Sequence, residues 1–190
     1  QSAADALDAS DTVTDSFTYT VSDGTATDTA TLIITVTGVN DSPVGVNDTG
    51  YIKEGGTLTV ADGGSAVSGT STGSNTGDIT GNDTDADASS TATITSITAT
   101  TASGSAQTTF SSNSETVTGS YGTLTINSNG SYSYVANSNI SGLDAGDSNI
   151  TDVFTYIVSD GSATDTATLT INIIASQDLT ARNDTGTVNE

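Results

Sequence analysis

An alternation of apolar and polar positions occurs twice in the chain in nearly the same form. Residues 152–174 read DVFTYIVSDGSATDTATLTINII, and residues 15–37 read DSFTYTVSDGTATDTATLIITVT. Sixteen of the 23 aligned positions are identical. Apolar residues recur at every second position on both sides of a Ser-Asp-Gly turn, so each copy predicts a β-hairpin with one apolar face. The two copies are 137 residues apart, and a segment duplicated at such a spacing is typical of a tandem-repeat protein.

Shorter alternating segments separate the two hairpins. They predict strands at 51–52, 57–60, 91–99, 108–110, 116–120, 124–126 and 132–134. The spacing of Ile94 and Ile97 breaks strict alternation and predicts a bulge. A Gly- and Ser-rich stretch at 61–78 predicts a long loop, and 79–90 predicts an acidic turn. About seven to nine short strands predict an all-β fold, an immunoglobulin-like or cadherin-like β-sandwich.

The duplication also predicts the domain organisation. The hairpin at 15–37 is followed by the linker GVNDSPVGVND, and a partial copy of this linker follows the second hairpin. NDTGYIKE at 47–54 matches NDTGTVNE at 183–190. We therefore expect tandem repeats: residues 1–46 as the C-terminal half of one repeat plus the linker, 47–182 as a complete sandwich, and 183–190 as the first strand of the next repeat.

Composition narrows the possible functions. The chain has 23 acidic and two basic residues, a formal net charge of −21, and neither Cys nor His. Without His and Cys, histidine-based acid–base catalysis, catalytic triads and zinc sites are excluded, and we expect no enzymatic activity. The acidic surface repels nucleic acid, and no apolar run is long enough for membrane insertion. The Thr-, Ser-, Asn- and Asp-rich composition suits a secreted, extracellular bacterial protein.

Calcium is the expected cofactor. The hydrophobic core is small and the many carboxylates repel one another, and a divalent cation bound by an acidic cluster would offset both. Asp83, Asp85 and Asp87 alternate with small residues, so their carboxylates point the same way in an extended loop. Asn82 adds a side-chain carbonyl. The alternative is a solvated acidic turn without a metal.

Two further sets of oxygen-bearing side chains flank the hairpins. The linker set is Asn40, Asp41, Asn47, Asp48 and Glu54, with counterparts at Asp178, Asn183, Asp184 and Glu190. A looser set is Asp144, Asp147 and Asp152, with counterparts at Asp8, Asp11 and Asp15. Acids at a repeat junction are suited to hold a cation that fixes the angle between neighbours. The alternative is that Asn and Asp serve only as turn residues. Asp23 and Asp160 are expected to form turns.

The motifs FTYxVSDGxATDTATLxI, GVNDSPV and GNDTDAD resemble the VCBS and cadherin-like repeats of large bacterial surface adhesins and biofilm-matrix proteins. The resemblance covers nearly the whole chain and implies immunoglobulin-like sandwiches in long tandem arrays, often secreted by a type I route and stiffened by calcium. Two departures stand out. ASQDLTA replaces the second proline linker, and Ala88-Ser89 replaces the Gly-Asp that often follows the acidic triplet.

Three functions follow as expectations. The first is a calcium-stiffened spacer in an extracellular array, with adjacent repeats as partners. The second is a self-assembling filament joined by strand donation between copies, in which the first hairpin supplies Phe17, Tyr19, Val21, Leu32, Ile34 and Val36. The third is a module that binds a glycan or a cell surface, although aromatic residues are few.

Overall fold

The computed structural model describes residues 6–64, 75–87, 91–100, 108–138 and 140–176. In these ranges the chain forms eleven strands and no helix. The strands are β1 (Thr12–Ser22), β2 (Thr27–Thr37), β3 (Asp48–Lys53), β4 (Thr57–Val60), β5 (Thr93–Ala99), β6 (Thr108–Thr109), β7 (Ser114–Thr118), β8 (Gly122–Asn127), β9 (Tyr132–Ala136), β10 (Ile150–Ser159) and β11 (Thr164–Ile174). Accordingly, this part of the chain has no helix long and apolar enough to cross a membrane.

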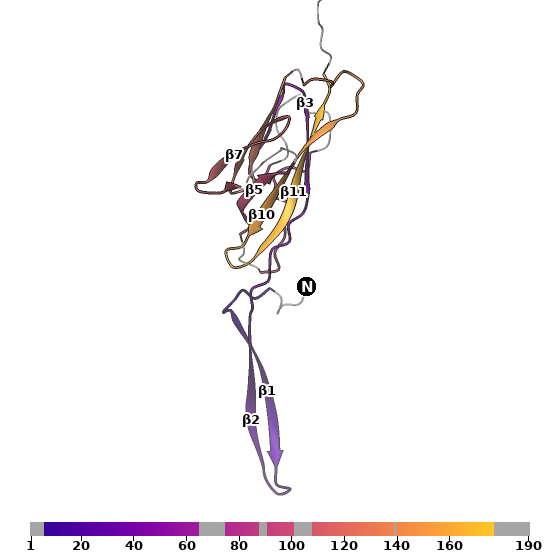
Figure 1. The fold of residues 1–190 in the computed structure, drawn as a ribbon. Helices are drawn as coiled ribbons and strands as arrows, with labels where there is room; N and C mark the ends of the chain where they lie inside the picture. The colour runs from indigo at the N-terminus through magenta and orange to yellow at the C-terminus, as the bar shows by residue number, and fades with distance from the viewer. Residues whose placement is uncertain (1–5, 65–74, 88–90, 101–107, 139, 177–190) are drawn as a thin grey trace, which may run out of the picture.

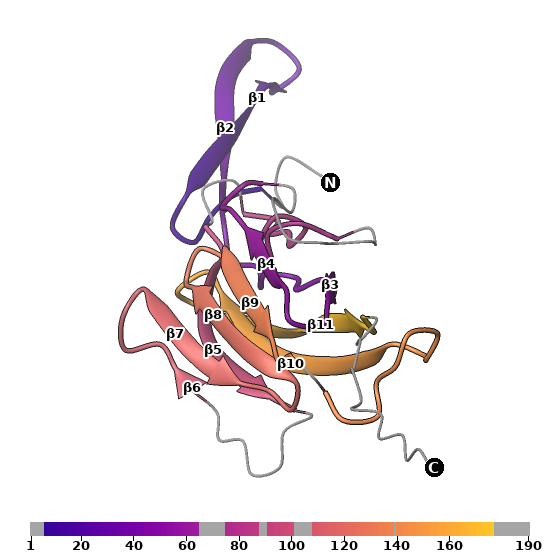
Figure 2. The same cartoon turned by 90° about the horizontal axis from the view of Figure 1, so that it is seen from above.

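Strands β3 to β11 build a β-sandwich of two sheets (Figures 1 and 2). One sheet has five strands in the order β3-β11-β10-β5-β6, and the other has four in the order β4-β9-β8-β7. β3 runs parallel to β11, and the other neighbouring strands are antiparallel. The predicted all-β fold and sandwich are therefore confirmed.

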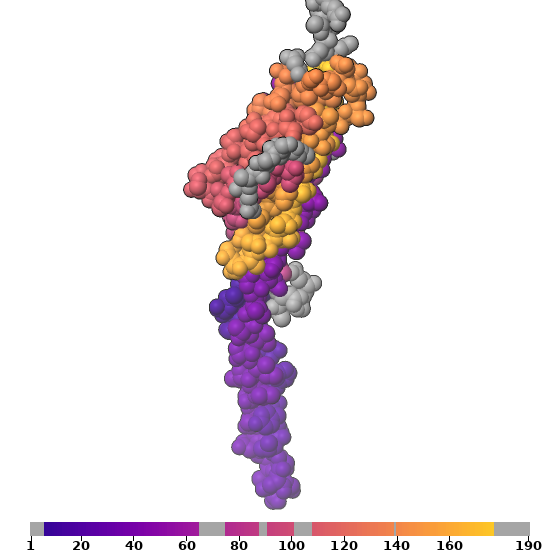
Figure 3. All heavy atoms as spheres, in the orientation of Figure 1, coloured from indigo at the N-terminus to yellow at the C-terminus, as the bar shows by residue number. Residues whose placement is uncertain are grey.

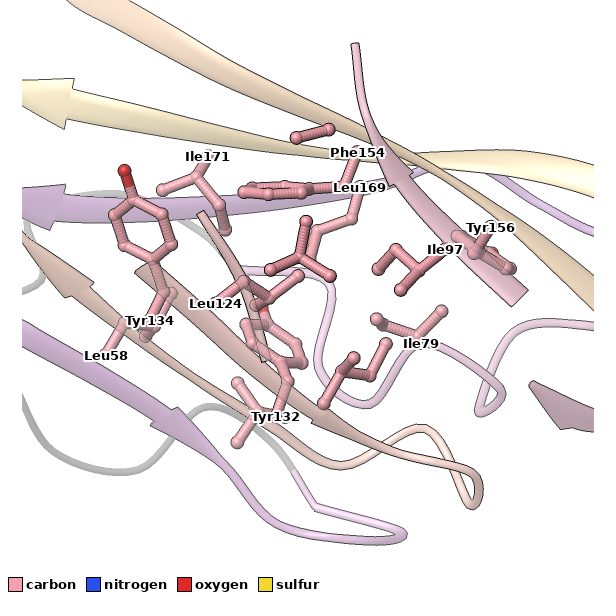
Figure 4. Packing of buried hydrophobic residues seen from close by; sticks show 14 of the residues in the cluster. Leu58, Ile79, Ile97, Leu124, Tyr132, Tyr134, Phe154, Tyr156, Leu169 and Ile171 are labelled. Carbon is pink, nitrogen blue, oxygen red and sulfur yellow. The ribbon is translucent and has the colours of Figure 1, made fainter. Parts of the chain in front are cut away.

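The core lies between the two sheets and follows the alternation of the sequence. From Asp152 to Val158 in β10 and from Ala167 to Ile173 in β11, every second side chain points inward and is buried, and Phe154 and Leu169 are fully buried. Tyr134 of β9 meets Phe154 edge-on, with ring centroids 6.2 Å apart (Figure 4). Leu124 of β8 completes this contact region from the four-stranded sheet. The alternation of apolar and polar residues in the sequence thus gives these sandwich strands one buried face each.

The bulge predicted for the segment 91–99 is confirmed. Ile157 of β10 pairs with Ser96 of β5. The next residue, Val158, pairs with Ile94, so one residue of β5 is skipped. The bulge shifts the alternation and allows both Ile94 and Ile97 to be buried.

The first hairpin, β1–β2, projects from one end of the sandwich as a narrow arm (Figures 1 and 3). Among the described strands, β1 and β2 pair only with each other, and every residue of both strands is exposed. The linker at 38–47 leads from this arm to β3. The proposed start of a third repeat, 183–190, lies outside the described residues.

Candidate cation site between the linker and the acidic loop

The linker and the acidic loop lie against each other. Val44 and Thr84 form a two-way backbone bridge, with N···O distances of 2.7 and 3.1 Å. On either side of this bridge, carboxylates of the loop accept linker N–H groups: Asp83 Oδ1 from Val46 at 2.7 Å, and Asp87 Oδ2 from Asp41 at 2.9 Å. The acidic turn therefore fixes the path of the linker.

In the described part of the chain, three buried acceptor oxygens of this loop have no hydrogen-bond partner. They are Oδ1 of Asn82, Oδ2 of Asp83 and Oδ1 of Asp87. Asp87 as a whole is only 7% exposed. A buried acceptor without a donor is unfavourable by about 1–3 kcal/mol, and by more when it is charged. Oxygens of this kind suit a hard cation, which takes carboxylate and amide oxygens alike.

The loop does not gather its three aspartates around one point. In the described ranges, no group of three or more Asp, Glu, His or Cys side chains is placed to hold a metal ion. Asp85 turns back instead, and its Oδ1 accepts the backbone N–H of Asp87 at 3.0 Å. The oxygens that accept no hydrogen bond are one amide oxygen of Asn82 and one carboxylate oxygen each of Asp83 and Asp87.

Asp48, at the start of β3, is a second buried acid beside this loop, with 1% of its surface exposed. Its carboxylate accepts hydrogen bonds from Thr76 Oγ1 at 2.9 Å, Asn82 Nδ2 at 3.1 Å and the Tyr156 hydroxyl at 3.0 Å. Burial outweighs these bonds and raises the pKa of Asp48 to about 6. Burial likewise raises the pKa of Asp83.

This pKa has a consequence for stability. The unfolded chain titrates Asp48 near 3.8, so between about pH 4 and 6 the folded protein binds this proton more tightly than the unfolded chain does. Ionisation of Asp48 therefore lowers the free energy of unfolding as the pH rises through that window. The full effect is on the order of 3 kcal/mol. A nearby cation would oppose it by favouring the ionised form.

The remaining candidate ligands of the linker set lie at two different ends of the sandwich. Asn40 donates through Nδ2 to Asp160 Oδ2 at 3.0 Å, at the tip of β10–β11. Asn47 Oδ1 accepts the Thr168 N–H of β11 at 2.9 Å. Glu54, by contrast, follows the far end of β3, about 20 Å from Asp48 by strand rise. Its carboxylate accepts the Ile140 N–H and, at 3.1 Å, the Ser176 hydroxyl. The structure does not bring Glu54 together with the others.

The third set is also divided. Asp152 is fully buried and accepts hydrogen bonds from the Ser120 and Tyr121 N–H groups at 2.8 and 3.0 Å and from the Tyr134 hydroxyl at 2.6 Å. Asp144 and Asp147 instead form an exposed turn, in which Asp147 Oδ2 accepts the Asp144 N–H at 2.8 Å. Asp152 thus connects the two sheets of the sandwich.

The turn role expected of Asp23 and Asp160 is confirmed. Asp160 Oδ1 accepts two N–H groups of its own turn, each at 2.6 Å, and Asp23 Oδ1 accepts the equivalent pair, each at 2.8 Å. These bonds to turn N–H groups hold the pKa of both carboxyls below the usual range. Asp184, with its neighbours Asp178, Asn183 and Glu190, lies outside the described residues.

Two features of the site were not predicted from the sequence. Asp78, 5% exposed, accepts the Gly63 N–H at 2.9 Å and the Thr80 N–H at 3.2 Å, which closes the loop ahead of the acidic turn. The hydroxyls of Tyr134 and Tyr156 donate to buried carboxylates. The signal for the tyrosines is present in the sequence, because both occupy core positions of the alternation and a buried hydroxyl needs a partner.

The fold is that of a cadherin-like β-sandwich domain. Residues 40–175 match the bacterial cadherin-like domain, and the chain belongs to this family. The match begins at the linker and ends just after β11, so it contains the whole sandwich and the candidate cation site.

Other comparisons add little. No curated protein matches the chain. Among solved structures, the chain is similar to an endo-fucoidan hydrolase, MfFcnA4, of glycoside hydrolase family 107, at 19% identity and a TM-score of 0.30, over 90% of this chain and 20% of the hydrolase chain. A variant of the same hydrolase gives 19% identity and a TM-score of 0.32 over the same shares. The chain therefore spans about a fifth of these proteins, and such TM-scores say nothing of its activity.

Proposed function

We propose that the chain is a non-enzymatic structural repeat of a secreted bacterial surface protein of the VCBS adhesin type, in which calcium stiffens the joint at the linker. The observation that carries the proposal is the set of three buried, unpartnered oxygens on Asn82, Asp83 and Asp87. They belong to the loop whose other carboxylate oxygens hold the linker. Family membership supports the coarser part, a structural or adhesive module.

The chain's own residues explain why this site would matter mechanically. Asp83 and Asp87 each use one carboxylate oxygen to hold a linker N–H, which leaves the other oxygen for a ligand. Calcium supplies the positive charge that residues 78–87 lack, since this stretch has four aspartates and no basic residue. Rotation of either carboxylate would then disturb the cation and the linker together, so binding would stiffen the joint.

Thermal unfolding with and without calcium tests the proposal. A site filled at 100 times its Kd stabilises the folded state by about 2.7 kcal/mol. For a domain of this size, this raises Tm by roughly 8–10 °C above the value in chelator. Asp87→Asn keeps the shape of the side chain and should remove most of the rise. Asp144→Asn removes the same charge from an exposed turn and should leave it intact.

Two outcomes would contradict the calcium role. One is a melting curve that is the same in calcium and in chelator. The other is an equal loss of the calcium effect in Asp87→Asn and Asp144→Asn, which would indicate diffuse charge screening rather than a site.

The other functions have less support. A sugar site needs exposed aromatic rings for stacking. In the described part of the chain only Phe17 and Tyr19, both in the hairpin arm, are exposed aromatic residues. Their counterparts in the sandwich are core residues. A filament joined by strand donation draws on the same exposed arm. A non-enzymatic role rests on the absence of His and Cys from the sequence.

A further inference from the structure

Strand β3 begins directly after the linker, and β11 is the last strand of the sandwich. The two strands lie side by side and run parallel, with six residue pairs in register from Asp48–Leu169 to Lys53–Ile174. At the far end, the Glu54 N–H adds a hydrogen bond to the Ile174 carbonyl at 3.0 Å. The chain therefore enters this pair of strands at one end and leaves it at the other (Figure 1). A pull along the chain through these two points slides β3 along β11.

The direction of the load decides how such a pair of strands separates. When one strand is lifted from its end, the hydrogen-bonded pairs break one after another, and each pair carries the load in turn. When two strands are pulled past each other, all the pairs share the load and have to break together. Forced unfolding follows the rate of unfolding rather than the equilibrium stability, so the same contacts can resist the two directions very differently.

Two asparagine side chains add hydrogen bonds between β3 and β11. Asn47 Oδ1 accepts the Thr168 N–H at 2.9 Å and the Thr168 hydroxyl at 3.0 Å, just before the first backbone pair. Asn172 Nδ2 donates to the Gly50 carbonyl at 3.3 Å in the middle of the pair. These bonds lengthen the contact that has to break when β3 slides.

Strand β3 is also held on its outer edge and its inner face. On the outer edge, the Thr49 N–H donates to Thr76 Oγ1 at 2.9 Å, and the Thr76 N–H donates to the Thr49 carbonyl at 3.0 Å. On the inner face, the backbone lies so close to its neighbours that a Cβ atom at Gly50 would be 2.7 Å from Ile171 Cδ1. Movement of β3 therefore breaks contacts on three sides.

Tension acts on the hairpin arm in the other direction. β1 and β2 are antiparallel, so the chain enters β1 and leaves β2 at the same end. At that end, the Gly38 N–H donates to the Asp11 carbonyl at 2.8 Å. A pull through Asp11 and Gly38 separates the strands pair by pair, from Thr12–Thr37 toward the tip. One chain thus contains a strand pair that tension slides and a strand pair that tension unzips.

We propose that the β3–β11 pair is a tension-bearing clamp, which resists force along the chain more strongly than force that lifts β3 from its end. The clamp keeps the sandwich folded under a load that opens the hairpin arm. This deepens the proposed structural role, and it rests on that role because a spacer is loaded along its length. It does not rest on calcium, since the hydrogen bonds between β3 and β11 use none of the three buried oxygens of the acidic loop.

Single-molecule stretching of the full chain in two directions tests the clamp. The sequence has no Cys, so a pair of Cys substitutions defines the points at which force is applied. Val46→Cys with Ser176→Cys slides the two strands, whereas Lys53→Cys with Ser176→Cys separates the same six pairs from one end. We expect a several-fold higher unfolding force in the sliding direction, in calcium and in chelator alike. Calorimetry should give the two variants the same Tm, so that the difference in force reflects direction alone.

A second pair of variants tests the added hydrogen bonds. Asn47→Ala should lower the unfolding force in the sliding direction and leave the separating force unchanged, because separation starts at the other end of β3. Thr125→Ala is the control, since it removes an exposed hydroxyl contact with Thr116 from the four-stranded sheet and should change neither force. In the chain stretched by its ends, the arm should open first and release roughly 90 Å.

Two results would overturn the clamp. One is the same unfolding force in both directions. The other is an equal loss of sliding force in Asn47→Ala and Thr125→Ala, which would mean that general stability sets the resistance. A force that depends on direction, together with a Tm that chelator leaves unchanged, would support the clamp and refute only the calcium role. Equal forces with a calcium-dependent Tm would refute the clamp and leave the calcium role intact.

Discussion

The two hairpins provide a matched pair of mutations, because the same residue type sits in the same local sequence with opposite burial. Leu169→Ala removes a fully buried side chain from β11, and Leu32→Ala removes its half-exposed counterpart from β2. A buried Leu→Ala change destabilises by about 2–5 kcal/mol, because apolar contacts are lost and a cavity remains. An exposed change of the same kind stays within about 0.5 kcal/mol.

The expected difference is large enough for a simple assay. For a domain of this size, about 3 kcal/mol corresponds to a Tm shift of roughly 10 °C. We expect Leu169→Ala to lower Tm by about this amount in differential scanning calorimetry and Leu32→Ala to lower it by less than about 2 °C. Phe154→Ala and Phe17→Ala form a second pair with the same expected contrast.

An equal loss of Tm in both members of a pair would contradict the different burial of the two hairpins. Equal losses would mean that the arm is covered in solution as β10–β11 is. Small losses in both would mean instead that the sandwich core does not pack as described, so both the direction and the size of the difference are informative.

Two further predictions concern buried carboxylates. Asp152→Asn should lower the free energy of unfolding by about 2–3 kcal/mol, because an amide cannot accept all three hydrogen bonds of the carboxylate. Asp15→Asn is the matched control, and a similar loss of stability in this variant would contradict the bridging role of Asp152. In chelator, urea unfolding should show stability increasing as the pH falls from about 6.5 to 4.5, because Asp48 then takes up its proton in the folded state. Asp48→Asn should flatten this part of the profile, and an unchanged slope in the variant would assign the proton to another group.

Strand positions were predictable from the sequence because they depend on local alternation. The β10–β11 hairpin needs only period-two apolar residues and a Ser-Asp-Gly tip. The bulge in β5 was equally local, since two isoleucines that must both be buried are out of phase. Such features require no knowledge of distant residues.

Burial was not predictable from the same patterns. Leu32 and Leu169 have nearly identical surroundings in sequence, yet one is 51% exposed and the other is fully buried. The difference comes from β3, β5 and the second sheet, which accompany only one hairpin. Local sequence specifies which face of a strand is apolar, and only the neighbouring strands decide whether that face is covered.

The candidate ligands show the same limit. Asp152 was grouped with Asp144 and Asp147 because they are close in sequence, but its donors come from residues 18 to 32 positions upstream. Glu54 was grouped with the linker, although a strand carries it to the other end of the sandwich. The acidic loop, in contrast, was found correctly as a turn, because its character depends only on its own residues.

Whether calcium binds at the linker can be determined from a crystal structure, with anomalous data, of crystals grown in calcium. We expect an ion about 2.3–2.6 Å from Asn82 Oδ1, Asp83 Oδ2 and Asp87 Oδ1, with Asp83 and Asp87 still holding the linker. This expectation would be contradicted if these three oxygens bound only water at saturating calcium, or if the ions lay only at the exposed Asp144–Asp147 turn.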